Sequence, residues 1–159
     1  MLPLVAVAAI VWLALLIAAP LLPVPLAASL YALGSRICHQ RPDRSFHLFA
    51  AQLPVCARCL GIYAGAALGS LLALSARMRF KRDILSPRQL LVGGVMPTAL
   101  TLVAEWTGTW ATSNGARAAA GVPLGVVVAL VVAQAVATLH YGGCAPRRPI
   151  ASNRPSTPI

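Results

Sequence analysis

The chain has 159 residues, of which 58% are hydrophobic and only 10% are charged, and its mean hydropathy is +0.78. Soluble domains carry about 25% charged residues, so this composition excludes an ordinary soluble protein and predicts a membrane protein whose main partner is the lipid bilayer. The formal net charge is +10, but the basic residues flank apolar segments, where they anchor to headgroups and set topology. We therefore expect no binding to nucleic acid.

The first apolar segment covers residues 2–33 and is interrupted by three prolines, Pro20, Pro23 and Pro25. Proline removes a backbone donor and clashes with the preceding turn, so one straight helix cannot continue through all three. A helix needs about 20 residues to cross the hydrocarbon core, which the residues before the prolines nearly supply. Residues 26–37 then either complete this span after a kink or lie in the membrane interface. The absence of a basic n-region argues against a cleaved signal peptide.

The second apolar segment is expected to form a helix over residues 54–76. Pro54 suits the first turn of a helix, where its missing N–H costs nothing. The segment carries Gly61, Gly65 and Gly69 at strict four-residue spacing. Small residues stacked on one helix face let a neighbouring helix approach closely. We therefore expect another helix to pack closely against this face. That helix could belong to a second copy of the chain, which would make the protein a homo-oligomer through its glycine-rich faces.

Two further apolar segments cover residues 89–107 and 118–141, and the last one again carries two glycines four residues apart. Residues 142–159 are rich in Pro, Ser and Arg, which predicts a disordered basic tail. The sequence thus predicts an all-α fold in a single membrane domain over residues 1–141. The domain is expected to be a bundle of about four transmembrane helices, the first of them broken by prolines.

A polar stretch from Cys38 to Tyr63 comprises the Cys/His-rich loop between the first and second spans, residues 38–53, and the start of the second span. It holds three of the four cysteines and two of the three histidines. Such a concentration in so apolar a chain indicates a metal or redox site. Cys56 and Cys59 form a C-x-x-C at the start of a predicted helix, where free N–H groups and the helix dipole favour thiolates. Thiolates three residues apart on a first turn point the same way and can share one ion.

Cys38 adds a third sulfur from across the loop, and His39, or alternatively His47, adds a fourth ligand. Structural zinc takes such a Cys₃His set tetrahedrally, so Zn²⁺ is the expected cofactor and iron the alternative. Because adjacent ligands such as Cys38 and His39 are awkward on one metal, His39 is alternatively an acid–base group beside an open metal position. Haem attachment is disfavoured, since Leu60 stands where a His is required.

Four spans place the Cys/His-rich loop and the turn after the third span on the same side of the membrane. An acid within a span marks a functional site by default, and Glu105 is expected to pair with an arginine, either as part of that site or as a plain interfacial ion pair. If the metal is catalytic, we expect metal-assisted hydrolysis or transfer on an anionic or lipid substrate. The catalytic candidates are His39, Glu105 and Arg117; the substrate-binding candidates are Arg44, Arg58 and Asn114; Glu105 is expected to pair with Arg117, Arg58 or Arg44.

Two sequence blocks and a later motif resemble a known family. Residues 38–46 read CHQRPDRSF and residues 54–65 read PVCARCLGIYAG, which is similar to domain-of-unknown-function family 2085, small multi-pass prokaryotic membrane proteins. The resemblance implies the topology and the set of site residues, and it supplies no reaction. The family's later motif is an Asp-Gly pair followed by Ser-Asn, two residues, Arg, three residues and Gly. Ser113, Asn114, Arg117 and Gly121 match it, whereas Glu105 stands in place of the Asp and Trp106 in place of the Gly. In the second block, Leu60 replaces a usual Thr.

Two other functions stay open from the residues alone. The first is a membrane thiol–disulfide oxidoreductase without a metal, in which Cys56 and Cys59 are the active pair and Cys38 is the resolving thiol. The second is a non-enzymatic transporter or assembly subunit in which a metal or a disulfide is structural. Cys144, in the tail on the other side of the membrane, is expected to take no part in the site.

The distribution of basic residues predicts the orientation. Eight Lys/Arg fall on the side of the termini and five on the side of the Cys/His-rich loop. The positive-inside rule then places both termini in the cytoplasm and the Cys/His-rich loop outside the plasma membrane. The five basic residues on the loop side are Arg36, Arg41, Arg44, Arg58 and Arg117.

Overall fold

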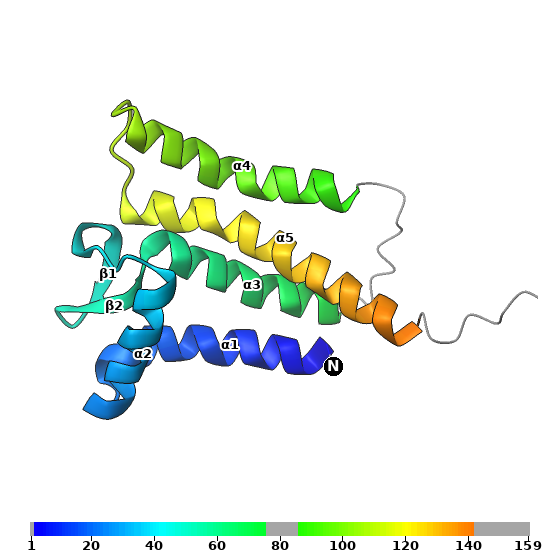
Figure 1. The fold of residues 1–159 in the computed structure, drawn as a ribbon, viewed down its shortest axis with the longest axis horizontal. Helices are drawn as coiled ribbons and strands as arrows, with labels where there is room; N and C mark the ends of the chain where they lie inside the picture. Colours follow the sequence, from blue (N-terminus) through cyan, green and yellow to red (C-terminus); the bar gives the residue numbers. More distant parts are fainter. Residues whose placement is uncertain (1, 76–85, 142–159) are drawn as a thin grey trace, which may run out of the picture.

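The computed structural model describes residues 2–75 and 86–141, with side chains described up to residue 136 (Figure 1). It confirms the predicted helical membrane bundle, because four of its helices are long and apolar enough to cross a membrane. Those spans are Leu2–Leu21, Ala57–Ser75, Pro87–Trp106 and Asn114–Val136. The helices are α1 (Leu2–Ala18), α2 (Val24–Ile37), α3 (Ala57–Ser75), α4 (Pro87–Trp106) and α5 (Asn114–Tyr141), with 3₁₀ turns at Ala19–Leu21 and Pro42–Arg44.

The prolines break the first apolar segment as predicted. Helix α1 ends at Ala18, a 3₁₀ turn containing Pro20 follows, and α2 begins at Val24 with Pro25 in its first turn, where no backbone donor is needed. With 14 residues, α2 is about 21 Å long, too short to cross the core, and it lies across the end of the bundle (Figure 1). The expected first span over residues 2–33 therefore needs correction: the segment of span length ends at Leu21.

The Cys/His-rich loop contains a short antiparallel hairpin that the sequence analysis did not predict. Strand β1 (Ser45–Leu48) pairs with β2 (Ala51–Cys56), with His47 opposite Gln52 and an irregular register beyond it. Pro54 lies buried in β2, so the expectation that it opens the second helix is wrong, and α3 begins at Ala57. A proline is tolerated in a strand where the ladder is interrupted, because no N–H is required there.

The glycines of α3 pack against α5 of the same chain. A Cβ on Gly61 or Gly65 would overlap a backbone carbonyl group of α5, and one on Gly69 would come within 2.7 Å of the Val126 oxygen. From the other side, Gly121 and Gly125 face backbone atoms of α3 in the same way. The predicted close packing is confirmed as contact within the chain. These faces are consequently not free for the homo-oligomer that the spacing also suggested.

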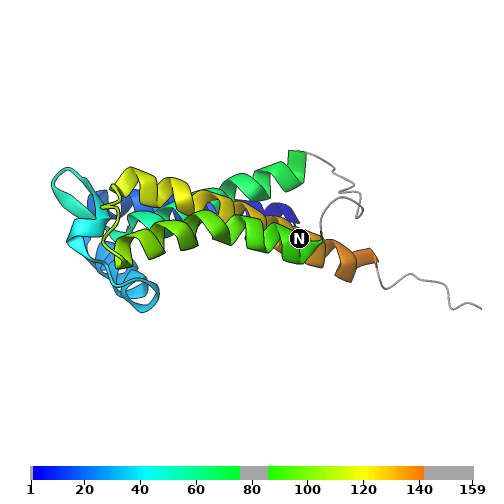
Figure 2. The ribbon, with the colours of Figure 1, turned by 90° about the horizontal axis from the view of Figure 1, so that it is seen from above.

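The remaining packing arranges the spans in the order α1, α3, α5, α4 (Figures 1 and 2). The first residues of α1, the end of α3, the start of α4 and the end of α5 lie at one end of the bundle. The hairpin, α2 and the connection between α4 and α5 lie at the other. All the predicted site residues among the described ones belong to this second end or to the helix turns beside it.

Candidate functional site

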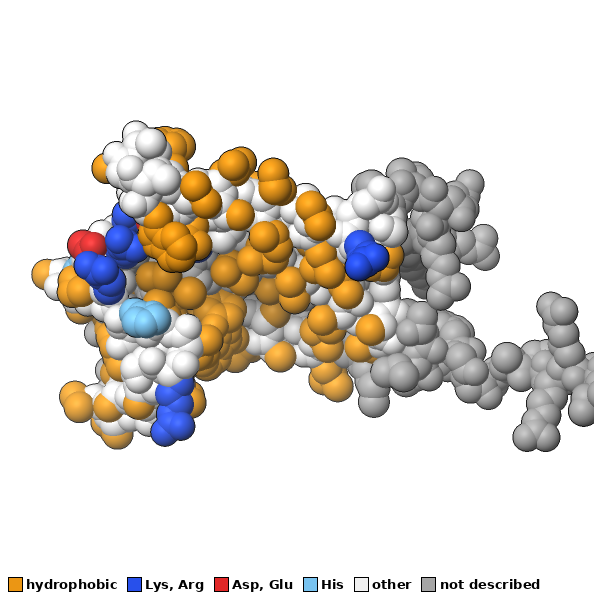
Figure 3. All heavy atoms as spheres, turned by 45° about the horizontal axis from the view of Figure 1, so that its top comes forward, with side chains coloured by type: hydrophobic (Ala, Val, Ile, Leu, Met, Phe, Trp, Pro, Cys, Tyr) orange, Lys and Arg blue, Asp and Glu red, His pale blue; other side chains and the backbone are white. Residues whose placement is uncertain are grey.

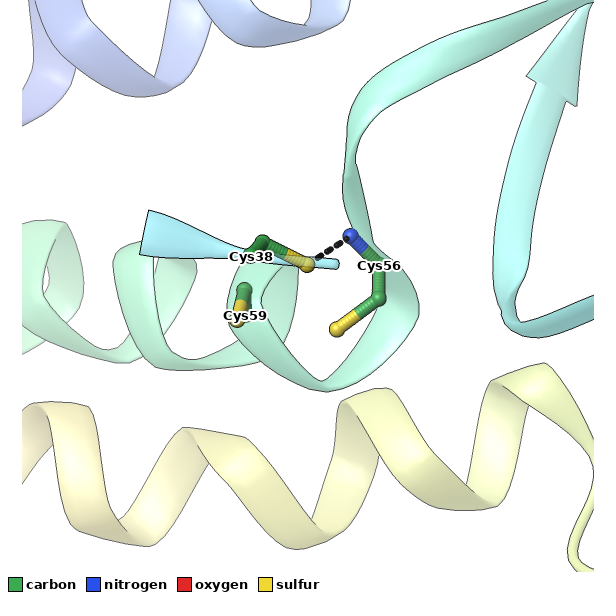
Figure 4. Close-up of side chains that lie close together, drawn as sticks. All are labelled: Cys38, Cys56 and Cys59. Atoms are coloured by element: carbon green, nitrogen blue, oxygen red, sulfur yellow. Dashed lines mark hydrogen bonds between the residues drawn. The ribbon is translucent and has the colours of Figure 1, made fainter. Parts of the chain in front are cut away.

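Three cysteine thiols meet where α2, β2 and α3 converge. Cys38 follows the last residue of α2, Cys56 is the last residue of β2, and Cys59 lies in the first turn of α3. Their sulfur atoms all lie within 4.8 Å of one another, and the cysteines are not joined in disulfides (Figure 4). Trp12 of α1 and Tyr63 of α3 pack, together with Cys56 and Cys59, against a buried apolar cluster that contains Cys38. The site is therefore built by the bundle and not by the loop alone.

The surroundings of Cys56 favour the thiolate form of this residue. The backbone N–H of Cys56 donates to the Cys38 sulfur at 3.2 Å (Figure 4). A hydrogen bond from the Cys59 thiol lowers the pKa of Cys56 from 9.0 to about 5, against the opposing effect of burial and with further help from the Cys59 N–H, the Cys38 thiol and the Arg58 N–H. The donors from Arg58 and Cys59 lie at the N-terminus of α3, where orphan N–H groups and the helix dipole attract negative charge.

The thiol cluster fits a tetrahedral thiophilic metal. Sulfurs bound at about 2.3 Å to one tetrahedral Zn²⁺ lie about 3.8 Å apart, which is compatible with the observed upper bound of 4.8 Å. Neither of the predicted histidine ligands joins this cluster within the described part of the chain. His47 is exposed on β1, and His39, next to Cys38, lines a neighbouring cavity. The geometry thus brings together three of the predicted ligands and leaves the fourth position without a protein ligand among the described residues.

Two glutamine side chains, which the sequence analysis did not single out, hold Cys38 against β2. The Gln40 amide donates to the carbonyl oxygens of Tyr31 at 2.8 Å and Pro54 at 2.7 Å. The Gln52 amide donates to the Gln40 carbonyl at 2.6 Å, and the Tyr31 hydroxyl donates to the Gln52 carbonyl. Gln40 has a φ of +46°, a conformation that costs energy for a residue with a side chain. Gln40 stands in the first sequence block, but neither its conformation nor its partners are visible in the sequence.

Glu105 accepts contacts from three arginines at once. Its side chain is 5% exposed; Arg117 Nε lies 2.9 Å and Arg58 Nη2 3.2 Å from its Oε1, and Arg44 Nη1 lies 3.6 Å from its Oε2. The Thr112 hydroxyl also donates to Oε1. The predicted pairing of Glu105 is confirmed for all three candidate partners. The carboxylate ties α4 to α3, α5 and the 3₁₀ turn that precedes the hairpin.

Asn114, the first residue of α5, links this ion-pair cluster to the hairpin. Its amide N–H donates to the Ser45 carbonyl at 3.1 Å, and its Oδ1 accepts from Arg117 Nη1 at 2.8 Å. Both ends of the amide are therefore satisfied within the protein, and Asn114 does not line the cavity described next. Its position orients the Arg117 guanidinium.

A cavity of about 460 Å³ adjoins the thiol cluster. Its walls combine basic, sulfur-containing and apolar side chains, and no carboxylate of the described residues lines it. Figure 3 shows most of the visible basic side chains and a histidine at this end, while the surface between the two ends is largely apolar. The basic lining residues are His39, Arg41, Arg44, Arg58 and Arg117; the sulfurs are those of Cys38, Cys56 and Cys59; the apolar wall includes Ile37, Ile62, Leu102 and Trp106.

The sequence matches uncharacterised archaeal proteins. A protein named "Uncharacterized protein MJ1492" from Methanocaldococcus jannaschii is 54% identical over 43 residues, which cover 27% of this chain and 28% of that protein. An "Uncharacterized protein" from Methanothermobacter thermautotrophicus is 32% identical over 95 residues, which cover 60% of this chain and 83% of that protein. No solved structure matches.

A family model described as "Predicted membrane protein (DUF2085)" matches residues 38–131. The matched range begins at the first thiol of the cluster and includes the hairpin, α3, α4 and most of α5. It thus contains every candidate residue assigned above to the site. The resemblance seen in the sequence motifs is confirmed, and the chain belongs to the DUF2085 family of membrane proteins.

Proposed function

We propose that this membrane protein holds a metal ion, Zn²⁺ in preference to iron, on the thiolates of Cys38, Cys56 and Cys59 at one membrane face. The observation that carries the proposal is the convergence of three thiols from three separate elements to within 4.8 Å. Thiolate ligands select zinc and iron–sulfur chemistry over hard cations. Neighbouring backbone N–H groups and the start of α3 stabilise the negative charge that such a site requires.

The proposed centre is catalytic because its surroundings supply more than a structural ion needs. Structural zinc sites are closed by four protein ligands, whereas catalytic ones keep a position for water or substrate. Here three thiols adjoin a basic cavity, and no histidine completes the set among the described residues. Three thiolates make the ion a weaker Lewis acid, so the cavity residues must contribute. We assign proton transfer to His39 and the holding of an anionic group to Arg44, Arg58 and Arg117.

The reaction class that follows is metal-assisted hydrolysis or transfer on an anionic or lipid substrate. Glu105 and Asn114 were both candidates for direct roles, as catalytic and substrate-binding residues respectively. Glu105 is enclosed by three guanidinium groups, and the Asn114 amide is satisfied within the protein. We therefore assign to Glu105 and Asn114 the role of positioning the arginines. His47 is exposed on β1, so it could bind the metal only if the hairpin moved toward the thiol cluster.

The decisive experiment measures metal content together with free thiols on protein purified in mild detergent without chelator. We expect about one zinc or iron per chain, with three thiols protected from alkylation. Cys56→Ser and Cys59→Ser should each release the metal and expose the remaining thiols. Cys144→Ser, outside the described residues, is the matched control and should retain it. Protein without metal whose thiols all react, or loss of metal in the control, would refute this centre.

The second candidate is a membrane thiol–disulfide oxidoreductase, which the lowered pKa of Cys56 favours. The Cys56 thiolate would attack a substrate disulfide, and a second thiolate, Cys59 or Cys38, would displace the reduced substrate and leave a disulfide in this protein. Two electrons pass to the substrate, so a dithiol donor or a quinol must return two electrons to the disulfide left in this protein. The same experiment separates the two: a metal-free protein with one reversible disulfide within the cluster supports the oxidoreductase. Bound metal without any turnover would instead support a structural role in a transporter or assembly subunit.

A further inference from the structure

We propose that the basic cavity beside the thiol cluster binds the phosphate headgroup of a membrane lipid, with a phosphomonoester as the best complement, and that the lipid enters from the bilayer. This inference rests on the proposed metal centre in one respect: the lipid phosphate would be the substrate of that centre. It narrows an anionic or lipid substrate to one chemical class and one route of entry.

The charge of the cavity favours a phosphate group. Four arginines line it, no carboxylate does, and the two acids beside them are Asp43 and Glu105. The four arginines and two acids leave a net charge of +2 around the cavity. That charge falls to +1 when three thiolates hold a divalent ion, because the metal centre then contributes −1. Arginine presents a fork of N–H donors that matches phosphate oxygens bidentately. An anion with one to two charges and several acceptor oxygens therefore complements this lining.

Two arginines that line the cavity, Arg44 and Arg58, each carry a buried Nε without a hydrogen-bond partner among the described residues. The Nε of Arg58 is buried and has no hydrogen-bond partner in the described residues, although Nη2 of the same group contacts Glu105 and Thr101. Buried donors are nearly always paired with protein, water or an ion. Arg58 lines the cavity, so a rotation of its guanidinium group would present this N–H to an anion bound there.

The apolar side of the cavity indicates a lipid and not a soluble phosphate. Ile37 at the end of α2 and Trp106 at the end of α4 both line it, and they are 59% and 79% exposed. Ile62 and Leu102, from the spans α3 and α4, continue the apolar wall. A soluble phosphate ester gains nothing from such walls, whereas acyl chains leaving between α2 and α4 would pass directly into the hydrocarbon. The volume of about 460 Å³ suits a headgroup with the first part of its chains.

Binding of short-chain phosphatidic acid to the detergent-purified, metal-analysed protein tests the proposal, with inorganic phosphate and the matching diacylglycerol as the other two ligands. We expect saturable binding of phosphatidic acid, much weaker binding of phosphate and none of diacylglycerol. Arg44→Gln and Trp106→Ala should each weaken the binding of phosphatidic acid by about tenfold or more. The first removes a positive charge that would contact the phosphate, and the second removes part of the apolar wall that would contact the acyl chains. Arg36→Gln and Trp110→Ala are matched controls, since neither residue lines the cavity, and should bind as the parent does.

Four outcomes would overturn the inference: no binding of phosphatidic acid, equal binding of diacylglycerol, equal binding of inorganic phosphate, or controls that lose as much affinity as the test variants. Inorganic phosphate that binds as tightly as phosphatidic acid would make the site one for a soluble anion and refute the lipid. Metal content of the same samples separates the two proposals. Metal bound without lipid binding refutes this inference alone, and lipid binding without metal refutes the metal centre alone.

Discussion

The acidity of Cys56 is the residue-level property that most directly affects chemistry. The pKa of its thiol is lowered from 9.0 to about 5 because the Cys59 thiol and nearby N–H groups donate hydrogen bonds to the thiolate. Since the folded state releases this proton more readily than the unfolded chain, the thiolate stabilises the fold above pH 9, and that contribution is lost as the pH falls from 9.0 towards 5. At neutral pH the metal-free protein therefore carries a thiolate ready to bind a metal or attack a disulfide.

Alkylation of metal-free, reduced protein checks this acidity. We expect the rate of Cys56 modification by iodoacetamide to reach its plateau a little above pH 5, where an ordinary cysteine would still be protonated. Cys59→Ala removes the principal donor and should move the midpoint upward by more than one pH unit. Peptide mapping by mass spectrometry identifies the modified residue at each pH. A midpoint above pH 8 in the parent protein would show that the hydrogen-bonded thiolate does not form.

At the scale of elements, the contact of α3 with α5 depends on glycine. Gly65→Ala should destabilise the protein by about 1–3 kcal/mol, since a Cβ there overlaps the Val122 carbonyl and the backbones must separate. Gly93→Ala in α4 is the matched control, because nothing lies within 4 Å of the added carbon. It should be neutral or slightly stabilising, as alanine is the better helix former. Unfolding in detergent, followed by circular dichroism, measures both; equal effects would contradict the observed packing.

The ion-pair cluster around Glu105 is a second contact between elements, and it joins α4 to α3 and α5. Glu105→Gln removes the charge that three guanidinium groups share and should cost about 3–5 kcal/mol, because it leaves partly buried positive charges uncompensated. Asp43→Asn, at an acid that is 59% exposed, should change the free energy of unfolding by at most about 1 kcal/mol. The same unfolding titration measures both variants. If Glu105→Gln proves as mild as Asp43→Asn, the cluster is not what fixes α4 against α3 and α5.

At the scale of the whole molecule, the orientation of the bundle in the membrane can be tested directly. We propose that the end bearing the thiols lies outside the plasma membrane and the termini inside, from the excess of basic residues on the terminal side. Seven of those eight, in residues 76–85 and 142–159, lie outside the described residues, and the remaining one is Arg88. The structure nevertheless separates two ends that a label can distinguish.

Single cysteines introduced at Ala111 and Ser86, on a Cys144→Ser background, report the orientation. Both positions are exposed, and they lie at opposite ends of α4. An impermeant maleimide polymer should shift the mass of the Ala111→Cys variant in intact cells, and that of the Ser86→Cys variant only after lysis. The unmodified background controls for labelling of the native thiols. The reverse pattern would place the thiol cluster in the cytoplasm.

The sequence by itself determined the features that depend on local composition. Crossing a bilayer is a property of each segment and its length, so hydropathy identified the four spans. The break at Pro20 follows from covalent chemistry that no tertiary contact can restore. The proximity of Cys56 and Cys59 follows from their spacing at a helix start, and the two motif blocks identified the family.

The tertiary structure alone decided how those pieces meet, because the deciding contacts join residues far apart in the chain. It placed Pro54 in a buried strand, where the Pro54 carbonyl accepts from the Gln40 amide, and it gave Gln40 a positive φ that no propensity predicts. It directed the α3 glycines to α5, where only the folded bundle shows that a backbone carbonyl occupies the space of a Cβ. It also joined Glu105 to three arginines at once and left both histidines outside the thiol cluster, choices that spacing in the sequence leaves open.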